Sequence, residues 1–299
     1  MRALVTGGAG FIGSHLVDAL LARGDDVSVV DDLSSGRREQ VPGDVPLHVV
    51  DIAEIAVAMA AERPDVVFHL AAQVDVRKSV ADPAHDARVN VASTASVLEA
   101  AHAVGVRRVL LASTGGALYG ESVALPTPED SPIAPYSPYG ASKAAAETYL
   151  ALYTRLHGLS TMALRFGNVY GPRQDPHGDA GVIAIFAGAA AEGRPVTVFG
   201  DGSQTRDYVY VADVVSGFLA AADSGATGEI NIGTGVETSV RELAEAFGVE
   251  MRFVPARTGE VARSCLDVSR AAELLGWRAE VTLADGLERT LAAVRAAVA

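Results

Sequence analysis

The sequence predicts an α/β fold, with a Rossmann-type doubly wound parallel sheet and a smaller C-terminal α/β lobe. In the first half of the chain, short runs rich in Val and Leu alternate with longer segments of helical periodicity. The short runs are apolar at odd and even positions alike, which is typical of parallel strands covered on both faces. The first run leads directly into a glycine-rich turn, residues 6–13, that opens a helix.

The elements of the first half follow in a regular order. We expect six strands, at residues 3–6, 26–30, 47–50, 66–70, 108–112 and 160–165. Helices are expected between them, at residues 11–23, 52–61, 84–104 and 138–157. Right-handed crossovers between such strands and helices give the doubly wound arrangement.

The pattern changes after Arg165. Residues 166–181 are rich in Gly, Pro and Asp, which predicts a long loop. The expected elements that follow are helices at 182–191, 211–222 and 239–247, strands at 195–199, 228–232 and 252–254, and a helical tail from residue 282. We therefore expect a Rossmann domain over 1–167, which also receives segments from about 207–235, and a second lobe over 168–299.

The composition excludes several classes of protein. The 299 residues carry a net charge of -13, whereas nucleic-acid binding requires a basic face. Cys265 is the only cysteine, so no intrachain disulfide can form. No run approaches the roughly 20 apolar residues that cross a bilayer. We expect a cytoplasmic protein that binds neither nucleic acid nor membrane. The histidines show no ligand spacing, and His177 beside Asp175 and Asp179 is expected in a solvated loop, so no metal is predicted.

The glycine-rich turn has the features of a dinucleotide-binding loop. Gly7, Gly10 and Gly13 follow a strand and open a helix, which is the context that such a fingerprint requires. Glycines allow the backbone N–H groups to approach a pyrophosphate, and the helix N-terminus adds partial positive charge. The loop therefore predicts a nicotinamide dinucleotide as cofactor.

Asp31 ends the second strand, 18 residues after Gly13, where a carboxylate can accept both ribose hydroxyls. Such an acid repels a 2′-phosphate, so Asp31 favours NAD over NADP, whereas the nearby Arg37 and Arg38 argue the other way. Past the third strand, residues 51–52 suit the adenine. Helix capping by Asp51 and core packing by Ile52 are almost equally plausible roles.

A tyrosine and a lysine one helical turn apart form the predicted catalytic pair. Tyr139 and Lys143 project from one face of a helix, and an ammonium beside a phenol favours the phenolate and lowers its pKa. Upstream, Ser113 and Thr114 follow a strand, at the edge of the sheet where ligands bind in such folds. Thr114 is expected to hydrogen-bond a substrate hydroxyl and to share a proton with Tyr139, although either hydroxyl could equally serve a turn.

Taken together, these motifs resemble the extended short-chain dehydrogenases/reductases, and within them the UDP-glucose 4-epimerase group of nucleotide-sugar epimerases. The resemblance runs almost from end to end. It rests on residues 6–13, 30–36, 69–73, Asn90, 113–120, 139–143, 165–172, 200–209 and 256–260.

The resemblance implies NAD as cofactor, a UDP-sugar as substrate and a redox mechanism. Tyr139 is expected to take the proton of the sugar's 4-hydroxyl while a hydride passes from carbon 4 to the nicotinamide. The 4-keto sugar then turns over and the hydride returns to its other face. Lys143 would hold the nicotinamide ribose, and the small Ser264 would leave room for an N-acetyl group.

The same resemblance assigns binding roles to further residues. Expected to bind NAD are Gly7, Gly10, Phe11, Ile12, Gly13, Asp31, Asp32, Leu33, Ser34, Gly36, Asp51, Ile52, Leu70, Ala71, Ala72, Gln73, Asn90, Tyr139, Lys143 and Phe166. Expected to bind the nucleotide sugar are Asn168, Val182, Val198, Arg206, Arg257 and Glu260. Without the resemblance, Arg206 would be half of a surface ion pair with Asp207.

Related functions remain as alternatives. The 4,6-dehydratases place an Asp-Glu pair after the strand-end threonine and the UDP-glucuronate decarboxylases use a carboxylate there, whereas this chain has Gly115 and Gly116. A UDP-glucuronate 4-epimerase passes this test. A non-catalytic NAD-sensing regulator is disfavoured because Tyr139 and Lys143 are both present. Similar enzymes dimerise through a four-helix bundle, so a homodimer built on helices 84–104 and 138–157 is expected.

Overall fold

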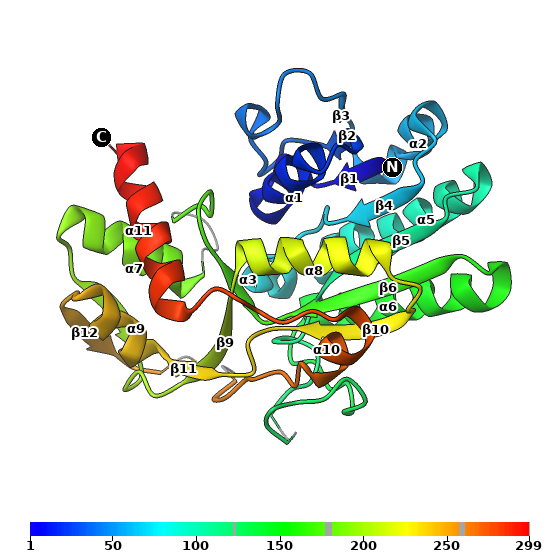
Figure 1. Cartoon of the computed structure of the whole chain (residues 1–299). Helices are drawn as coiled ribbons and strands as arrows, with labels where there is room; N and C mark the ends of the chain where they lie inside the picture. The colour runs from blue at the N-terminus through cyan, green and yellow to red at the C-terminus, as the bar shows by residue number, and fades with distance from the viewer. Residues whose placement is uncertain (122–123, 177–180, 257–260, 299) are drawn as a thin grey trace.

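A seven-stranded parallel sheet forms the centre of the molecule (Figure 1). The computed structural model describes residues 1–121, 124–176, 181–256 and 261–298. The strands lie in the order β10-β6-β5-β4-β1-β2-β3, and every neighbouring pair is parallel. Their bounds are β1 Arg2–Thr6, β2 Asp26–Asp31, β3 Leu47–Val49, β4 Val66–His69, β5 Arg108–Thr114, β6 Ser160–Phe166 and β10 Gly228–Ile232. The predicted fold class is confirmed.

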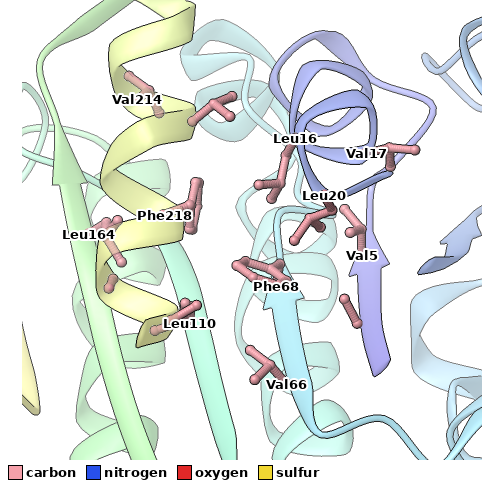
Figure 2. Packing of buried hydrophobic residues seen from close by; sticks show 14 of the residues in the cluster. Val5, Leu16, Val17, Leu20, Val66, Phe68, Leu110, Leu164, Val214 and Phe218 are labelled. Atoms are coloured by element: carbon pink, nitrogen blue, oxygen red, sulfur yellow. The ribbon is translucent and has the colours of Figure 1, made fainter. Parts of the chain in front are cut away.

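Both faces of the sheet are covered because its strands alternate between two cores. In β4, Val66 and Phe68 face α1 (Phe11–Ala22) and α8 (Val211–Asp223), as Figure 2 shows. Val67 belongs to the opposite core, with α2 (Ala56–Glu62), α5 (Ser93–Val104) and α6 (Pro138–His157). A strand that is buried on both faces needs apolar residues at every position, and the sequences of these strands show such continuous apolar runs.

Helix α6 has the bounds that the sequence predicts. Ser137 caps its N-terminus by accepting the Gly140 N–H at 3.1 Å, and Pro138 fills the first turn. Gly158, with φ 67°, ends the helix in the left-handed conformation. These local signals fix the register of the helix. In the described ranges no helix is long and apolar enough to cross a membrane.

The predicted helix over 84–104 is interrupted. The structure has α4 (Pro83–Ala87), a π-helical turn η3 (Arg88–Ala92) and then α5. The Ser93 hydroxyl reaches the carbonyl of Arg88, five residues back, at 3.2 Å, and Asn90 turns its amide toward Gln73. These polar contacts widen the turn. Further short elements are α3 (Val76–Ala81), η1 (Arg38–Gln40) and η2 (Ile52–Glu54).

The C-terminal part contains two small sheets. One has the order β11-β9-β7 and the other pairs β12 with β8. The bounds are β7 Asn168–Tyr170, β8 Val196–Phe199, β9 Thr205–Tyr210, β11 Glu237–Ser239, β12 Met251–Val254, α7 Val182–Glu192, α9 Val240–Phe247, α10 Ser269–Leu275 and α11 Leu283–Val298. Strand β7 lies inside the stretch predicted as a loop, so that part of the prediction is wrong. The division into two domains near residue 167 stays a prediction.

Candidate active site

The glycine loop lies where the order of the parallel sheet reverses. Strand β1 has β2 on one side and β4 on the other, so the loops after β1 and β4 diverge from adjacent strands. Gly7 has φ +70°, and a Cβ added there would lie 2.7 Å from the Ala71 nitrogen. The two loops therefore meet backbone to backbone, at the switch point where doubly wound sheets bind ligands.

The loop can accept a pyrophosphate because side chains are excluded from it. A Cβ at Gly13 would lie 2.1 Å from the Gly7 oxygen, and one at Gly10 would lie 3.2 Å from the same atom. No side chain caps the N-terminus of α1, and its first turn holds no acidic residue. The backbone N–H groups at the N-terminus of α1 are therefore suited to bind an anion, and the residues of the loop fit the diphosphate of NAD. Phe11 and Ile12, both half-buried, open this helix.

Asp31 braces the loop from the end of β2. One carboxylate oxygen accepts the Ala9 N–H and the other the Leu33 N–H, each at 2.9 Å. Burial raises the pKa of Asp31, and the two backbone hydrogen bonds oppose that rise. Each oxygen keeps one further lone pair for a hydroxyl donor. On the exposed turn beyond, Asp32 accepts the Ser34 N–H at 2.9 Å.

The structure puts residues 51–52 in the alternative roles that the sequence left open. Asp51 caps η2 by accepting the Ala53 N–H at 2.8 Å. Ile52 is buried in the core on the α2 face of the sheet. Neither contact tests their predicted place beside the adenine. Phe166 is likewise buried, in the core on the other face.

A buried chain of hydrogen bonds, which the sequence analysis missed, holds the loop after β4. The Thr6 hydroxyl accepts the N–H groups of Leu70 and Ala71, each at 3.1 Å, and its own proton points to His69 Nδ1 at 2.8 Å. His69 Nε2 then donates to Thr94 at 3.0 Å. Burial lowers the pKa of His69 to about 3, so the ring is neutral. A histidine at the end of a buried strand was the available signal.

The same loop is fixed at its far end by Asn90. Its side chain accepts the Gln73 N–H at 3.0 Å and donates to the Gln73 oxygen at 2.9 Å. Leu70, Ala71, Ala72 and Gln73 are half-buried. The segment predicted to line the cofactor is therefore held at both ends by buried side chains.

Tyr139 and Lys143 come together at the C-terminal end of β5. Lys143 Nζ donates to the Ala112 oxygen at 2.9 Å and lies 6.0 Å from the centroid of the Tyr139 ring. Ala112 directly precedes Ser113 and Thr114. The predicted pair and the predicted strand-end hydroxyls thus lie in one place.

The pKa of Tyr139 departs from the prediction. Burial raises it well above the usual value, and the Asp86 carboxylate raises it further. Burial also lowers the pKa of Lys143 to about 8, against the opposing effects of Glu147 and Asp86. The sequence analysis expects Lys143 to lower the pKa of Tyr139 with the help of the positive charge of oxidised nicotinamide, and without that charge burial raises this pKa. Desolvation is the larger of the two causes.

The two strand-end hydroxyls have different surroundings. Ser113 is buried and donates to Glu147 Oε1 at 2.5 Å. Glu147 also forms a buried ion pair with Arg165, at 2.7 Å, and Arg165 donates to the Tyr119 hydroxyl at 2.8 Å. Thr114 is half-buried and makes no such contact with Glu147. Ser113 is thus tied to α6, which leaves Thr114 as the better placed hydroxyl for a ligand.

The two glycines after Thr114 have unequal room. A Cβ at Gly115 would lie 2.5 Å from the Leu266 Cδ2 atom, so any side chain there collides with the core. A Cβ at Gly116 would lie 3.6 Å from Asn168 Oδ1, an ordinary contact. Asn168, a predicted substrate residue, therefore lies beside the catalytic strand.

The other predicted substrate residues are partly described. Arg206, half-buried on β9, donates to the Thr205 oxygen at 2.7 Å, and the Ser264 N–H reaches the same oxygen at 3.2 Å. Arg206 and Ser264 are thus neighbours. Val182 begins α7 and is half-buried, whereas Val198 is fully buried in the C-terminal core, where its side chain meets other apolar residues. Arg257 and Glu260 lie outside the described residues.

Asp207 does not lie on the surface, as the alternative for Arg206 assumed. It is buried and accepts the N–H groups of Thr234 and Gly235, at 2.8 and 3.0 Å. Within the described ranges no cluster of His, Cys, Asp or Glu suits a metal ion. His177 and Asp179 lie outside them.

A dinucleotide loop at the switch point and a Tyr–Lys pair beside it define an NAD-dependent enzyme of the extended short-chain dehydrogenase/reductase type. The chain belongs to the NAD dependent epimerase/dehydratase family, whose model matches residues 3–233. It is similar to a UDP-glucose 4-epimerase of Mycolicibacterium smegmatis, 50% identical over 97% of each chain. The resemblance stated from the motifs is confirmed.

Solved structures agree with this assignment. The chain is similar to the crystal structure of a UDP-glucose 4-epimerase with UDP-glucose from Thermotoga maritima, with a TM-score of 0.98 and 45% identity over 100% of both chains. It is also similar to a Thermus thermophilus UDP-glucose 4-epimerase in complex with NAD, with a TM-score of 0.93 and 45% identity over 99% of this chain and 100% of that one.

Proposed function

We propose that the protein interconverts UDP-glucose and UDP-galactose by NAD-dependent 4-epimerisation. The observation that carries this proposal is that Lys143, with Tyr139 beside it, donates to Ala112 at the end of β5, two residues before Thr114, in a sheet whose β1 carries the glycine loop. Relatives and solved structures of this name that match nearly the whole chain support it.

NAD fits between the loops after β1, β2 and β4. The uncapped N-terminus of α1 would hold its diphosphate, Asp31 its adenine ribose and Lys143 its nicotinamide ribose. When bound, NAD supplies the hydride acceptor and a positive charge next to the phenol. The acidic side chain of Asp31 favours NAD over NADP because it repels a 2′-phosphate. Arg37 and Arg38, which would argue for NADP, are exposed.

Tyr139 is the proposed general base and Thr114 its partner. Tyr139 would take the proton of the sugar's 4-hydroxyl while Thr114 orients that hydroxyl by a hydrogen bond. Bringing a phenol from its usual pKa near 10 to about 7 requires roughly 4 kcal/mol of differential stabilisation. Because burial raises the pKa of Tyr139 here, the stabilisation needed exceeds this figure, and Lys143 and the cofactor's positive charge would supply it together.

Arg206 and Asn168 are proposed to anchor the nucleotide sugar. Asn168 of β7 pairs with Tyr208 of β9, so Asn168 and Arg206 lie on adjacent strands. Arginine suits a diphosphate because its planar fork binds two oxygens at once. Arg257 and Glu260 are proposed to complete the nucleotide site. The anchor must hold UDP while the hexose rotates, so tight contacts are expected on the nucleotide side alone.

A second substrate pair is proposed because of Ser264. This small, half-buried residue adjoins Arg206, and its size suits an N-acetyl substituent. UDP-GlcNAc and UDP-GalNAc are therefore candidate substrates, and UDP-glucuronate is an alternative. A dehydratase or decarboxylase is disfavoured, since Gly115 and Gly116 stand where those enzymes carry an acidic side chain.

A homodimer through α5 and α6 is also proposed. The two helices pack on each other, with His102 and His157 rings 4.3 Å apart. Leu156 and Tyr149 of α6 are 67% and 38% exposed. Pairing these helices with their copies across a two-fold axis would form a four-helix bundle and cover both side chains.

The test is an epimerisation assay with a matched pair of variants. Purified protein with UDP-glucose should form UDP-galactose without net release of NADH. Tyr139→Phe should lose this conversion while NAD stays bound, and Tyr136→Phe, whose ring is 60% exposed, should retain it. Full activity in Tyr139→Phe would refute the assigned role. A panel of UDP- and dTDP-sugars would then define the preferred base and sugar.

A further inference from the structure

Asp86 of α4 is fully buried, and only one of its two carboxylate oxygens has hydrogen-bond partners in the described part of the chain. Its Oδ1 atom accepts hydrogen bonds from Gln73 Nε2 at 2.8 Å and Asn90 Nδ2 at 3.0 Å. Its Oδ2 atom has no hydrogen-bond partner among the described residues. Burying a carboxylate oxygen without a partner is costly, so a nearby positive charge is needed to balance it.

Lys143 presents the opposite requirement. It is 4% exposed, and its ammonium donates to the neutral oxygen of Ala112. The carboxylate one turn further along the helix, Glu147, raises the pKa of Lys143, but it is shared with Arg165, with which it pairs at 2.7 Å. A buried ammonium also needs a counter-charge.

The other charged groups around α6 do not meet that requirement. His69 at the end of β4 is neutral, and Arg165 on β6 is matched by Glu147. Arg77 and Lys78 on α3, Arg88 on η3, and Glu99 and His102 on α5 are exposed. Two further groups are buried: Asp75 caps α3 by accepting the Arg77 and Lys78 N–H groups, and Arg108 on β5 donates to Ser160 and to the Ala226 oxygen. Asp86 lies on α4, which packs against α6, and its charge acts on both Lys143 and Tyr139.

We propose that Asp86 is a positioning residue for the proton transfer, a buried counter-ion that, together with Glu147, keeps Lys143 charged and sets the pH range in which Tyr139 works. The part that concerns the reaction rests on the proposed function. Gln73 and Asn90 orient the carboxylate, so the loop that lines the cofactor is linked to the charge of the catalytic pair.

The sign of the effect follows from electrostatics. A negative charge raises the pKa of every nearby group, here of both Tyr139 and Lys143. Activity requires the phenolate of Tyr139, which sets the acid limb of the pH profile, and the ammonium of Lys143, which sets the alkaline limb. Neutralising Asp86 lowers both pKa values, so both limbs of the bell-shaped pH profile of kcat move to lower pH.

The first test is the pH dependence of kcat for UDP-glucose in Asp86→Asn. The amide keeps the size of the side chain and an oxygen acceptor for Gln73 and Asn90. We expect both limbs to move to lower pH by about one unit. The control is Asp213→Asn, a buried carboxylate on α8 that accepts two backbone N–H groups, which should leave both limbs in place. A lower rate with both limbs unmoved in Asp86→Asn would overturn the proposal.

The second test needs no sugar and so separates this inference from the proposed function. The phenolate absorbance of the NAD-loaded protein is titrated, with the Tyr139→Phe variant subtracted. Tyr139 should ionise about one pH unit lower in Asp86→Asn than in the wild type. An unchanged titration would contradict the role of Asp86, even if no UDP-sugar is turned over.

Asp86→Glu decides the matter should the amide variant not fold. It retains the charge, so both limbs and the phenol titration should stay where they are in the wild type, whatever happens to the rate. A displacement of about one pH unit would show that the position of the side chain, and not its charge, controls the pair.

Discussion

The buried ion pair between Glu147 and Arg165 should dominate the stability of the region that carries the active site. Both side chains are 4% exposed, and the carboxylate accepts from Arg165 Nε at 3.0 and 3.2 Å and from Arg165 Nη2 at 2.7 Å. It also accepts the Ser113 hydroxyl at 2.5 Å. In Glu147→Gln, one of the two acceptor oxygens becomes a donor that faces the guanidinium.

Leaving a buried arginine without its counter-charge costs about 3–5 kcal/mol, and the oxygen kept by glutamine places the expected loss near the lower end, about 3 kcal/mol. In a chain of this size that corresponds to a fall in Tm of roughly 5 °C. Differential scanning calorimetry at neutral pH measures it. The control is Asp65→Asn, which breaks the Arg2–Asp65 pair at 3.0 Å, with side chains 52% and 39% exposed. That loss should be about 1 kcal/mol or less.

A double-mutant cycle separates the pair from its surroundings. Glu147→Leu combined with Arg165→Met replaces two charges by apolar side chains and leaves neither charge buried alone. The double variant should be more stable than the sum of the single variants predicts by about 2 kcal/mol or more. Additive losses, or a Glu147→Gln variant that melts within about 2 °C of the wild type, would refute this reasoning.

Three further outcomes are expected. Thr114→Ala should lower kcat by about 10–100-fold with little change in Tm. Ser113→Ala should chiefly lower the free energy of unfolding, by about 1–2 kcal/mol, because Glu147 loses a hydrogen-bond donor. Kinetics and melting curves measured side by side distinguish the two variants. Burial raises the pKa of Asp31, so Asp31 is protonated at a higher pH than an ordinary carboxylate. As the pH is lowered, the affinity for NAD should therefore begin to fall at that higher pH. Titration calorimetry should find this dependence missing in Asp31→Asn. Leu156→Glu should shift the proposed dimer toward monomer in analytical ultracentrifugation, and an unchanged sedimentation coefficient would exclude α6 from the interface.

The sheet and helix α6 were predictable because their signals are local. Each strand of the first half is a run of apolar residues that the two cores require, and β1, β3, β4 and β5 are each followed by a helix. Helix α6 carries its start and stop signals in Ser137, Pro138 and Gly158. No distant contact is needed to find any of them, so spacing and residue type were sufficient.

The interruption at η3 and strand β7 were not predictable for the opposite reason. The π-helical turn depends on Asn90 reaching Gln73, which lies on another loop. Strand β7 exists because Asn168 pairs with Tyr208, on a strand 40 residues further along the chain. Between Gly and Pro residues, three residues of strand give no periodicity that a sequence analysis can detect.

The candidate site divides in the same way. The helical spacing of Tyr139 and Lys143 predicted a pair on one face of α6, and Lys143 lies over the Tyr139 ring and donates to Ala112, two residues before Thr114. The chain of contacts from Ser113 through Glu147 to Arg165 joins β5, α6 and β6, and no local sequence pattern predicts it. The direction of the pKa shift of Tyr139 was missed because burial depends on the whole fold.

That missed direction changes how the catalytic pair should be understood. With burial and Asp86 both raising the pKa of Tyr139, the phenol stays protonated in the protein alone. Lys143, with a pKa lowered to about 8, holds its charge at neutral pH but does not make the phenol acidic. In the proposed function, Tyr139 would then act as base only when a further positive charge enters the site, which is what an oxidised nicotinamide carries. Cofactor binding and activation of the base are then one event, and a sugar bound without cofactor keeps its 4-hydroxyl proton.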